Sequence, residues 1–145
     1  MDQDLRLIFW EITKKCNLEC SHCRASAESV SSPFDLTTLQ AKNFIDQVAS
    51  FAKPVIVFSG GEPLVRGDIF ELIQYAKNSN LKTGIATNAT LIKESTASML
   101  KKSGIDIVAV SVYGPDRESH DAFCGNEGAF DKTLEGIASL KKAGI

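Results

Sequence analysis

The sequence has no long apolar segment, no excess of positive charge, and no repeated or low-complexity region. No apolar run approaches the roughly 18 residues that a membrane-spanning helix needs, so we expect no membrane partner. The net charge of −2 provides no broad basic surface, and we therefore expect no nucleic-acid partner. The N-terminal sequence MDQD (residues 1–4) lacks the pattern of a signal peptide, which makes a cytoplasmic location the default expectation.

The remaining composition is that of an ordinary globular domain. With 145 residues, 43% of them hydrophobic and 23% charged, the chain is long enough to bury a core and fits one domain. Three of its four cysteines, Cys16, Cys20 and Cys23, lie within one short stretch. Cysteines crowded into one loop of a chain without a secretion signal favour a metal site over disulfides.

Strand-like and helix-like segments alternate along the chain. Runs rich in β-branched and aromatic residues predict strands at residues 7–13, 55–58, 82–87 and 107–112. Helical spacing of apolar residues predicts a helix after each strand, the last over residues 131–143. Such alternation indicates an α/β fold, a parallel sheet with helices over at least one face. The apolar strands suggest burial on both faces.

Local signals mark the helix ends. Thr37 and Gln40 fit a capping box that begins the first helix, and Pro54 follows its end. The sequence at Asp68 imitates a capping box that opens the second helix, and Gly104 is expected to end the third.

Every candidate functional residue follows a predicted strand. The cysteines come after the first strand, Gly60, Gly61 and Glu62 after the second, Asn88 after the third, and Ser111 with Tyr113 at the end of the fourth. In parallel α/β folds the functional groups gather at the carboxyl ends of the strands. We therefore expect these residues to form one site.

The three clustered thiols predict a soft metal site. Thiolates select zinc, Cu(I) or iron–sulfur clusters. A closed zinc site needs four protein ligands, which here requires His22 or Cys124 as the fourth. A [4Fe–4S] cluster held by three cysteines keeps one iron open to a small molecule. Inert thiols are the third alternative.

Two motifs together resemble the radical S-adenosylmethionine (radical SAM) superfamily. The first is Cys-x3-Cys-x2-Cys with a ring-bearing residue, His22, before the last cysteine, and the second is Ser-Gly-Gly-Glu-Pro at residues 59–63. The resemblance implies a TIM-like partial (β/α) barrel. It also implies that residues 1–145 form a radical SAM core domain of about four βα units, incomplete at its C-terminus. The residues around these two motifs look most like those of the branch that modifies haem precursors or ribosomal peptides. Members of that branch often carry auxiliary clusters in a C-terminal domain.

The resemblance also implies a cofactor set and a reaction. Reductive cleavage of S-adenosylmethionine would yield a 5′-deoxyadenosyl radical that abstracts hydrogen from a haem precursor or peptide, with a flavodoxin or ferredoxin as electron donor. The protein would supply position and electrostatics rather than catalytic side chains. A non-catalytic zinc- or cluster-binding module is the alternative. The implied cluster ligands are Cys16, Cys20 and Cys23, and the implied cofactor-binding residues are His22, Gly60, Gly61, Glu62, Asn88 and Ser111.

Two residues depart from the family pattern, and the sequence leaves several roles possible for the fourth cysteine. Ala89 stands where glycine is common, so the turn after Asn88 could differ, and Tyr113 stands where an aspartate is frequent, so no contact of that aspartate is carried over. Cys124 could be a small buried hydrophobe, a reactive thiol or a fourth ligand. Nearby, His120 and Asp121 are expected to be solvated loop residues.

Overall fold

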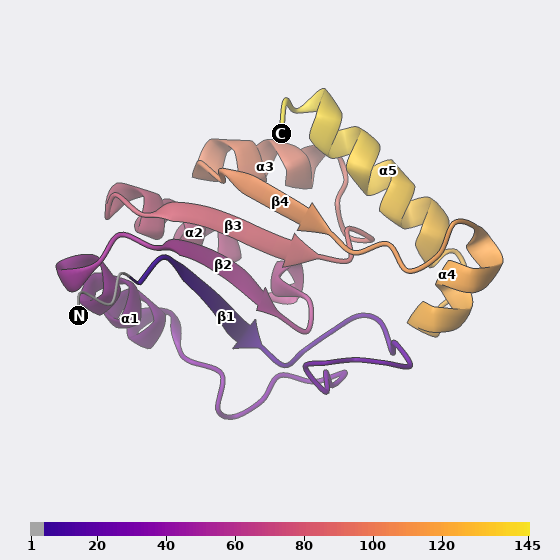
Figure 1. The fold of residues 1–145 in the computed structure, drawn as a ribbon, viewed down its shortest axis with the longest axis horizontal. Helices are drawn as coiled ribbons and strands as arrows, with labels where there is room; N and C mark the ends of the chain where they lie inside the picture. Colours follow the sequence, from indigo (N-terminus) through magenta and orange to yellow (C-terminus); the bar gives the residue numbers. More distant parts are fainter. Residues whose placement is uncertain (1–4) are drawn as a thin grey trace.

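The computed structural model describes residues 5–145 and shows a four-stranded parallel sheet in the order β1-β2-β3-β4 (Figure 1). Residues 1–4, whose sequence lacks the signal-peptide pattern, lie outside the part of the chain that the structure describes. Because each strand is followed by at least one helix, the expected α/β class is confirmed. The elements are β1 (Leu7–Thr13), α1 (Thr38–Phe51), β2 (Val55–Gly60), η1 (Pro63–Val65), α2 (Ile69–Asn78), β3 (Lys82–Thr87), α3 (Glu94–Ser103), β4 (Ile107–Val110), α4 (Arg117–Cys124) and α5 (Ala129–Lys142).

Local chemistry explains most of the boundaries. Thr37 and Gln40 form the predicted capping box at the start of α1. Gly104 ends α3 in the left-handed conformation with φ of 83°, which glycine adopts without steric cost. The prediction of a side-chain cap at Asp68 was wrong, because its carboxylate does not cap α2 and instead pairs with Arg66 and Thr38.

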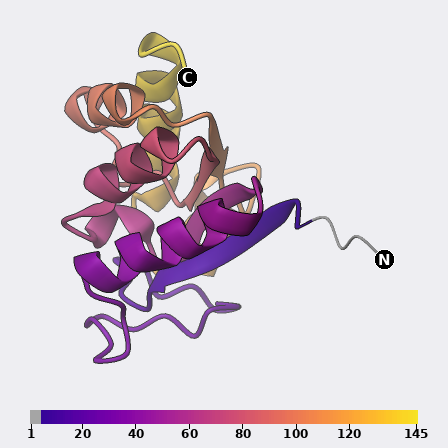
Figure 2. The same ribbon diagram turned by 90° about the vertical axis from the view of Figure 1, so that its left-hand side faces the viewer.

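The core lies between the sheet and the helices α1, α2 and α3, which cover one face (Figures 1 and 2). Side chains on this face, such as Ile56, Phe58 and Ile85, are fully buried against Ile73 and Leu100 of the helices. Successive residues of a strand point to opposite faces, so this packing fixes the register of each strand.

The opposite face of the sheet corrects one expectation. Leu7 is 48% exposed, Phe9 60% and Ile107 55%, and within residues 5–145 no helix covers them. The expectation that both faces of the sheet are buried was therefore wrong for this part of the chain. Some apolar strand residues, including Leu7, Phe9 and Ile107, face solvent. No helix of the described residues is both long and apolar enough to cross a membrane.

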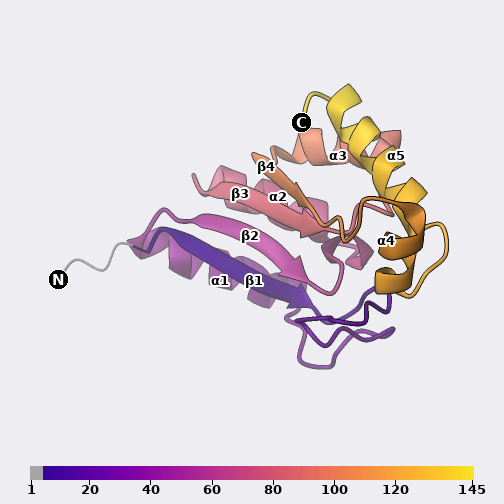
Figure 3. The ribbon, with the colours of Figure 1, turned by 45° about the vertical axis from the view of Figure 1, so that its right-hand side comes forward.

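The segment between β4 and α5 contains a helix that the sequence reading had treated as loop. Asp116 caps α4, which ends at Cys124 and is followed by Gly125 in the left-handed conformation. His120 is only 1% exposed, and the Asp121 carboxylate accepts hydrogen bonds from the first turn of α5. The expectation of solvated loop residues was wrong because α4 folds back onto the loop that carries the cysteines (Figure 3).

Candidate functional site

A cavity of about 380 Å³ opens at the carboxyl ends of the strands and brings the predicted residues together. The cysteine loop (residues 14–36) forms one wall, and the ends of β2, β3 and β4 form the others. All of the predicted site residues except Glu62 line this cavity, namely Cys16, Cys20, His22, Cys23, Gly60, Gly61, Asn88 and Ser111. Tyr113, which was expected at the site because it follows the fourth strand, lines the cavity as well, and so does Glu11, which the sequence did not indicate.

The three clustered thiols are accessible from the cavity to different degrees. Cys16 and Cys20 are half-buried, whereas Cys23 is exposed. Burial raises the pKa of Cys16 and of Cys20, so without a bound cation both sulfurs keep their protons more strongly than a free thiol does. A coordinated metal reverses this preference because it favours the deprotonated thiolate.

Hydrogen bonds hold the beginning of the cysteine loop in place. The Cys16 amide donates to the carbonyl oxygen of Glu28 at 2.8 Å, and the Glu28 amide donates to that of Lys14 at 2.9 Å. The sulfur of Cys16 accepts a hydrogen bond from the Leu18 amide. Hydrogen bonds therefore hold both the backbone amide and the sulfur of Cys16 in place without a bound ligand.

The donor chemistry suits a soft, multi-atom group. Within residues 5–145, no group of three or more His, Cys, Asp or Glu side chains is placed to hold a metal ion directly. The fit rests instead on Cys16, Cys20 and Cys23, which share one cavity, and thiolates are the ligands of iron–sulfur clusters.

The glycine pair after β2 allows two segments to touch. Gly60 has φ of 123°, and a Cβ there would lie 2.3 Å from the Thr13 carbonyl oxygen. A Cβ on Gly61 would lie 2.3 Å from the carbonyl oxygen of Lys15. The Gly61 amide donates to the Thr13 carbonyl at 2.8 Å, so these glycines set the distance between β2 and the start of the cysteine loop.

Glu62 lies beneath the cavity rather than on its surface. Its carboxylate is fully buried and accepts hydrogen bonds from the Leu64 amide, the Asn88 amide and the Thr87 hydroxyl. Burial raises the pKa of Glu62, opposed by these three donors. Its side chain thus ties the end of β2 to the end of β3.

Asn88 links the end of β3 to the cysteine loop. Its side-chain amide donates to Asn17 at 3.0 Å, directly after the first cysteine, and Asn17 in turn donates to Thr90. Ala89 has φ of 60°, so the turn keeps the left-handed conformation although glycine is absent. The Thr133 hydroxyl of α5 donates to the Asn88 carbonyl and supports the turn from behind.

Aromatic rings connect the cysteine loop to the end of β4. The ring of Phe123 in α4 stacks on Tyr113 at 4.2 Å between centroids and lies 5.7 Å from His22. The Tyr113 amide donates to Nδ1 of buried His120. Sequence reasoning missed this cluster because it missed α4, although Asp116 and Gly125 were available as signals for the two ends of that helix.

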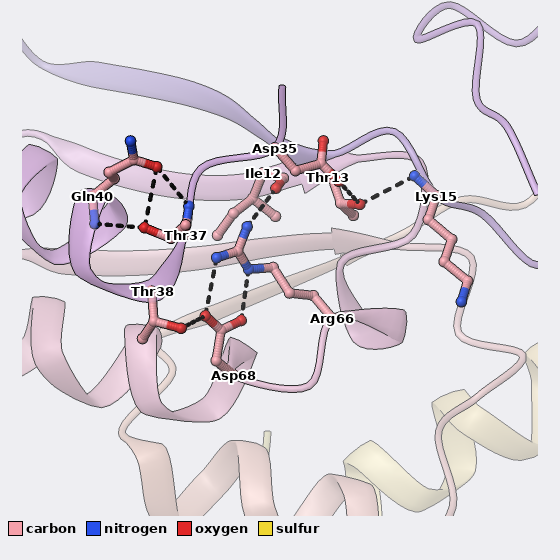
Figure 4. Close-up of polar contacts among 9 residues, drawn as sticks. All are labelled: Ile12, Thr13, Lys15, Asp35, Thr37, Thr38, Gln40, Arg66 and Asp68. Carbon is pink, nitrogen blue, oxygen red and sulfur yellow. Dashed lines mark hydrogen bonds and ion pairs between the residues drawn. The ribbon is translucent and has the colours of Figure 1, made fainter. Parts of the chain in front are cut away.

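An ion pair behind the site holds the end of β1 (Figure 4). The Arg66 guanidinium donates to both carboxylate oxygens of Asp68 and, at 2.9 Å, to the Ile12 carbonyl. Thr38 of α1 also donates to Asp68, and the Thr13 hydroxyl donates to Asp35. This network joins β1, α1 and α2 immediately before the cysteines.

Known proteins resemble this chain over almost its whole length. The pattern of the radical SAM superfamily matches residues 10–145. The chain is 46% identical over 138 residues to the AdoMet-dependent heme synthase of Methanosarcina barkeri, covering 95% of this chain and 40% of the relative. It therefore spans about two fifths of that relative's length.

Solved structures share the fold. The structure of native anSMEcpe with bound AdoMet matches with a TM-score of 0.79 and 28% identity, over 97% of this chain and 42% of that one. The structure of Streptococcus suis SuiB bound to precursor peptide SuiA matches with a TM-score of 0.79 and 25% identity, over 97% and 31% of the two chains.

Proposed function

The chain belongs to the radical SAM superfamily, and we propose that it carries the cluster and S-adenosylmethionine sites of an enzyme that acts on a haem precursor or a peptide. Enzymes of this superfamily use a [4Fe–4S] cluster and S-adenosylmethionine, and its TIM-like fold is the one found here. The observation that carries the proposal is the single cavity shared by Cys16, Cys20, Cys23 and the Gly60–Gly61 turn.

We assign the cluster to Cys16, Cys20 and Cys23. Their thiols are the only cysteine side chains that line the cavity among the described residues, and three thiolates leave one iron of a [4Fe–4S] cluster without a protein ligand. Cys16, Cys20 and Cys23 would hold the cluster, and the chemistry supplied there would be the single-electron reduction that cleaves S-adenosylmethionine to methionine and a 5′-deoxyadenosyl radical for hydrogen abstraction from the substrate.

The remaining residues bind and orient the cofactor. The Gly60–Gly61 backbone faces the cavity beside the cysteine loop and suits the amino group of the methionine part. We place the adenosine part against His22, Asn88 and Ser111, which line the same cavity. Glu62 supports this binding site from beneath the cavity. Its carboxylate accepts hydrogen bonds from the Asn88 amide and the Thr87 hydroxyl and so orients the end of β3.

The substrate and the electron donor are parts of the same proposal. A haem precursor is supported by the similarity to an AdoMet-dependent heme synthase, and a peptide by the similarity to SuiB, which was solved with a precursor peptide. A flavodoxin or ferredoxin is the class of protein that delivers single electrons. We propose a cytosolic location because all four cysteines are unpaired thiols, as a reducing compartment keeps them.

Anaerobic reconstitution with iron and sulfide tests the assignment. We expect about four irons per chain in the native protein. Loss of the visible absorbance is expected in Cys16→Ala, Cys20→Ala and Cys23→Ala, whereas Cys124→Ala should retain the cluster. S-adenosylmethionine should then change the electron paramagnetic resonance (EPR) spectrum of the reduced cluster. A zinc-binding chain with no iron would contradict the proposal and support the non-catalytic module.

A further inference from the structure

Arg24 directly follows the third cysteine and is the only lysine or arginine among the described residues that lines the cavity. Its side chain is exposed and forms no hydrogen bond or ion pair with the rest of residues 5–145. Arg66 and Arg117, in contrast, each pair with an aspartate. The cavity therefore contains a permanently charged guanidinium whose N–H donors have no partner in the described part of the chain.

The backbone that carries Arg24 is held in place by hydrogen bonds to Cys23. The Ser26 amide donates to the Cys23 carbonyl at 3.4 Å and closes a turn that contains Arg24. The Ala27 amide donates to the Cys23 sulfur at 3.3 Å. Because both bonds converge on the residue before Arg24, its guanidinium extends into the cavity from an anchored turn.

Glu11 of β1 is the only carboxylate side chain among the described residues that lines the same cavity. It is exposed and also lacks a hydrogen bond or ion pair with residues 5–145. Its neighbours Trp10 and Ile12 pack into the core under the helices, so the alternation of the strand places Glu11 on the open face together with Phe9. Two unpaired charges of opposite sign thus line one cavity, one from the cysteine loop and one from the sheet.

This charge arrangement distinguishes between the groups that a ligand can present. A guanidinium binds a carboxylate through two parallel hydrogen bonds, a geometry that few other groups match. The carboxylate of Glu11 repels the same group. A molecule that carries a carboxylate therefore binds best with that carboxylate at Arg24 and with an uncharged or cationic part at Glu11.

We propose that Arg24 is a specificity-determining residue whose guanidinium binds a carboxylate of the substrate. The inference deepens the proposed function and rests on it, because it requires this cavity to hold the substrate beside S-adenosylmethionine. Haem precursors carry carboxylates on their propionate groups, and peptides carry them on aspartate and glutamate side chains. The recognised group is the same for either source.

The test measures the binding of two pairs of probes by equilibrium dialysis under anaerobic conditions. The first pair is coproporphyrin III, a haem precursor with free propionates, and its methyl ester. The second pair is a short glutamate-containing peptide and the same peptide with glutamine. The variants are Arg24→Gln, which removes the charge, and Arg24→Lys, which keeps it without the bidentate geometry. Lys14→Gln is the matched control, because Lys14 is an exposed cation of the same loop that does not line the cavity.

We expect Arg24→Gln to weaken the binding of one carboxylate probe about tenfold, the effect of losing one charge-assisted contact. Arg24→Lys should lose less, and Lys14→Gln no more than about twofold, because salt screens a charge outside the cavity. The ester or the glutamine peptide should bind the native protein and the Arg24 variants equally. The probe that responds identifies the source of the carboxylate.

Iron content and the affinity for S-adenosylmethionine are measured in parallel and should not change. A tenfold loss of S-adenosylmethionine affinity in Arg24→Gln overturns the inference, because the guanidinium would then bind the carboxylate of the cofactor. The inference is also overturned if neither carboxylate probe loses more affinity in Arg24→Gln than in Lys14→Gln, or if the uncharged probes lose as much as the charged ones. Absence of a cluster in the native protein refutes the proposed function itself, whereas unchanged probe binding refutes only the role of Arg24.

Discussion

Replacing Arg66 by methionine should destabilise the protein strongly, because Arg66 connects three elements at the end of β1. The substitution keeps much of the apolar stem and removes the guanidinium. It deletes the two hydrogen bonds to Asp68, at 2.6 and 3.0 Å, and the one to the Ile12 carbonyl at 2.9 Å. Asp68 then retains Thr38 as its side-chain donor, with no cation beside it.

The size of the effect follows from burial. The side chains of Arg66 and Asp68 are 11% and 17% exposed, so water replaces the lost partner poorly. Removing one member of a buried pair costs about 3–5 kcal/mol, and the residual exposure places this pair near the lower limit, at about 3 kcal/mol. A loss of that size lowers the melting temperature by about 10 °C in a domain of this length.

Urea denaturation followed by circular dichroism measures the loss, with Lys142→Met as the matched control. Lys142 pairs with Glu94 at 2.6 Å, but both side chains are 70% exposed, so its removal should cost no more than about 1 kcal/mol. Arg66→Lys should fall between the two, because lysine restores the charge without the bidentate geometry. If Arg66→Met lost no more stability than Lys142→Met, the argument that Arg66 clamps β1 would be refuted.

Two further predictions concern the glycine turn and acid stability. Gly61→Ala should lower both iron content and S-adenosylmethionine affinity, because its Cβ would lie 2.3 Å from the Lys15 carbonyl oxygen; Gly67→Ala, with no atom within 4 Å of the added Cβ, should change neither. Equal iron content and affinity in the two variants would contradict this reading of the turn. Burial alone would raise the pKa of Asp68 and Asp106, but hydrogen bonds from their cationic partners outweigh it and lower both below the ordinary value of 3.8. These carboxylates therefore stabilise the fold above pH 3.8, and the free energy of unfolding should fall as the pH drops below 3.8 through the lowered values. Denaturant titrations at several acidic pH values test this, and a stability that did not change over that range would argue against it.

The strand and helix order could be predicted from the sequence because it depends on local patterns. The strand at residues 7–13 and the capping box at Thr37 required only side-chain periodicity and one hydrogen-bonding motif. The cysteine spacing and the Gly60–Gly61 pair pointed to the site for a similar reason, because both lie at the end of a strand. In a parallel sheet those ends meet at one edge.

The tertiary structure decided which neighbours each residue has, since these depend on contacts between distant segments. Glu62 was expected to face a ligand, yet its carboxylate is enclosed by donors from β3 and from η1. Cys124 had three possible roles in the sequence, and only the folding of α4 onto the cysteine loop places it against Cys20. Phe9 reads as core in an apolar strand, but it is exposed because helices cover the other face of the sheet. Periodicity determines which side chains share a face, whereas burial depends on which elements pack against that face.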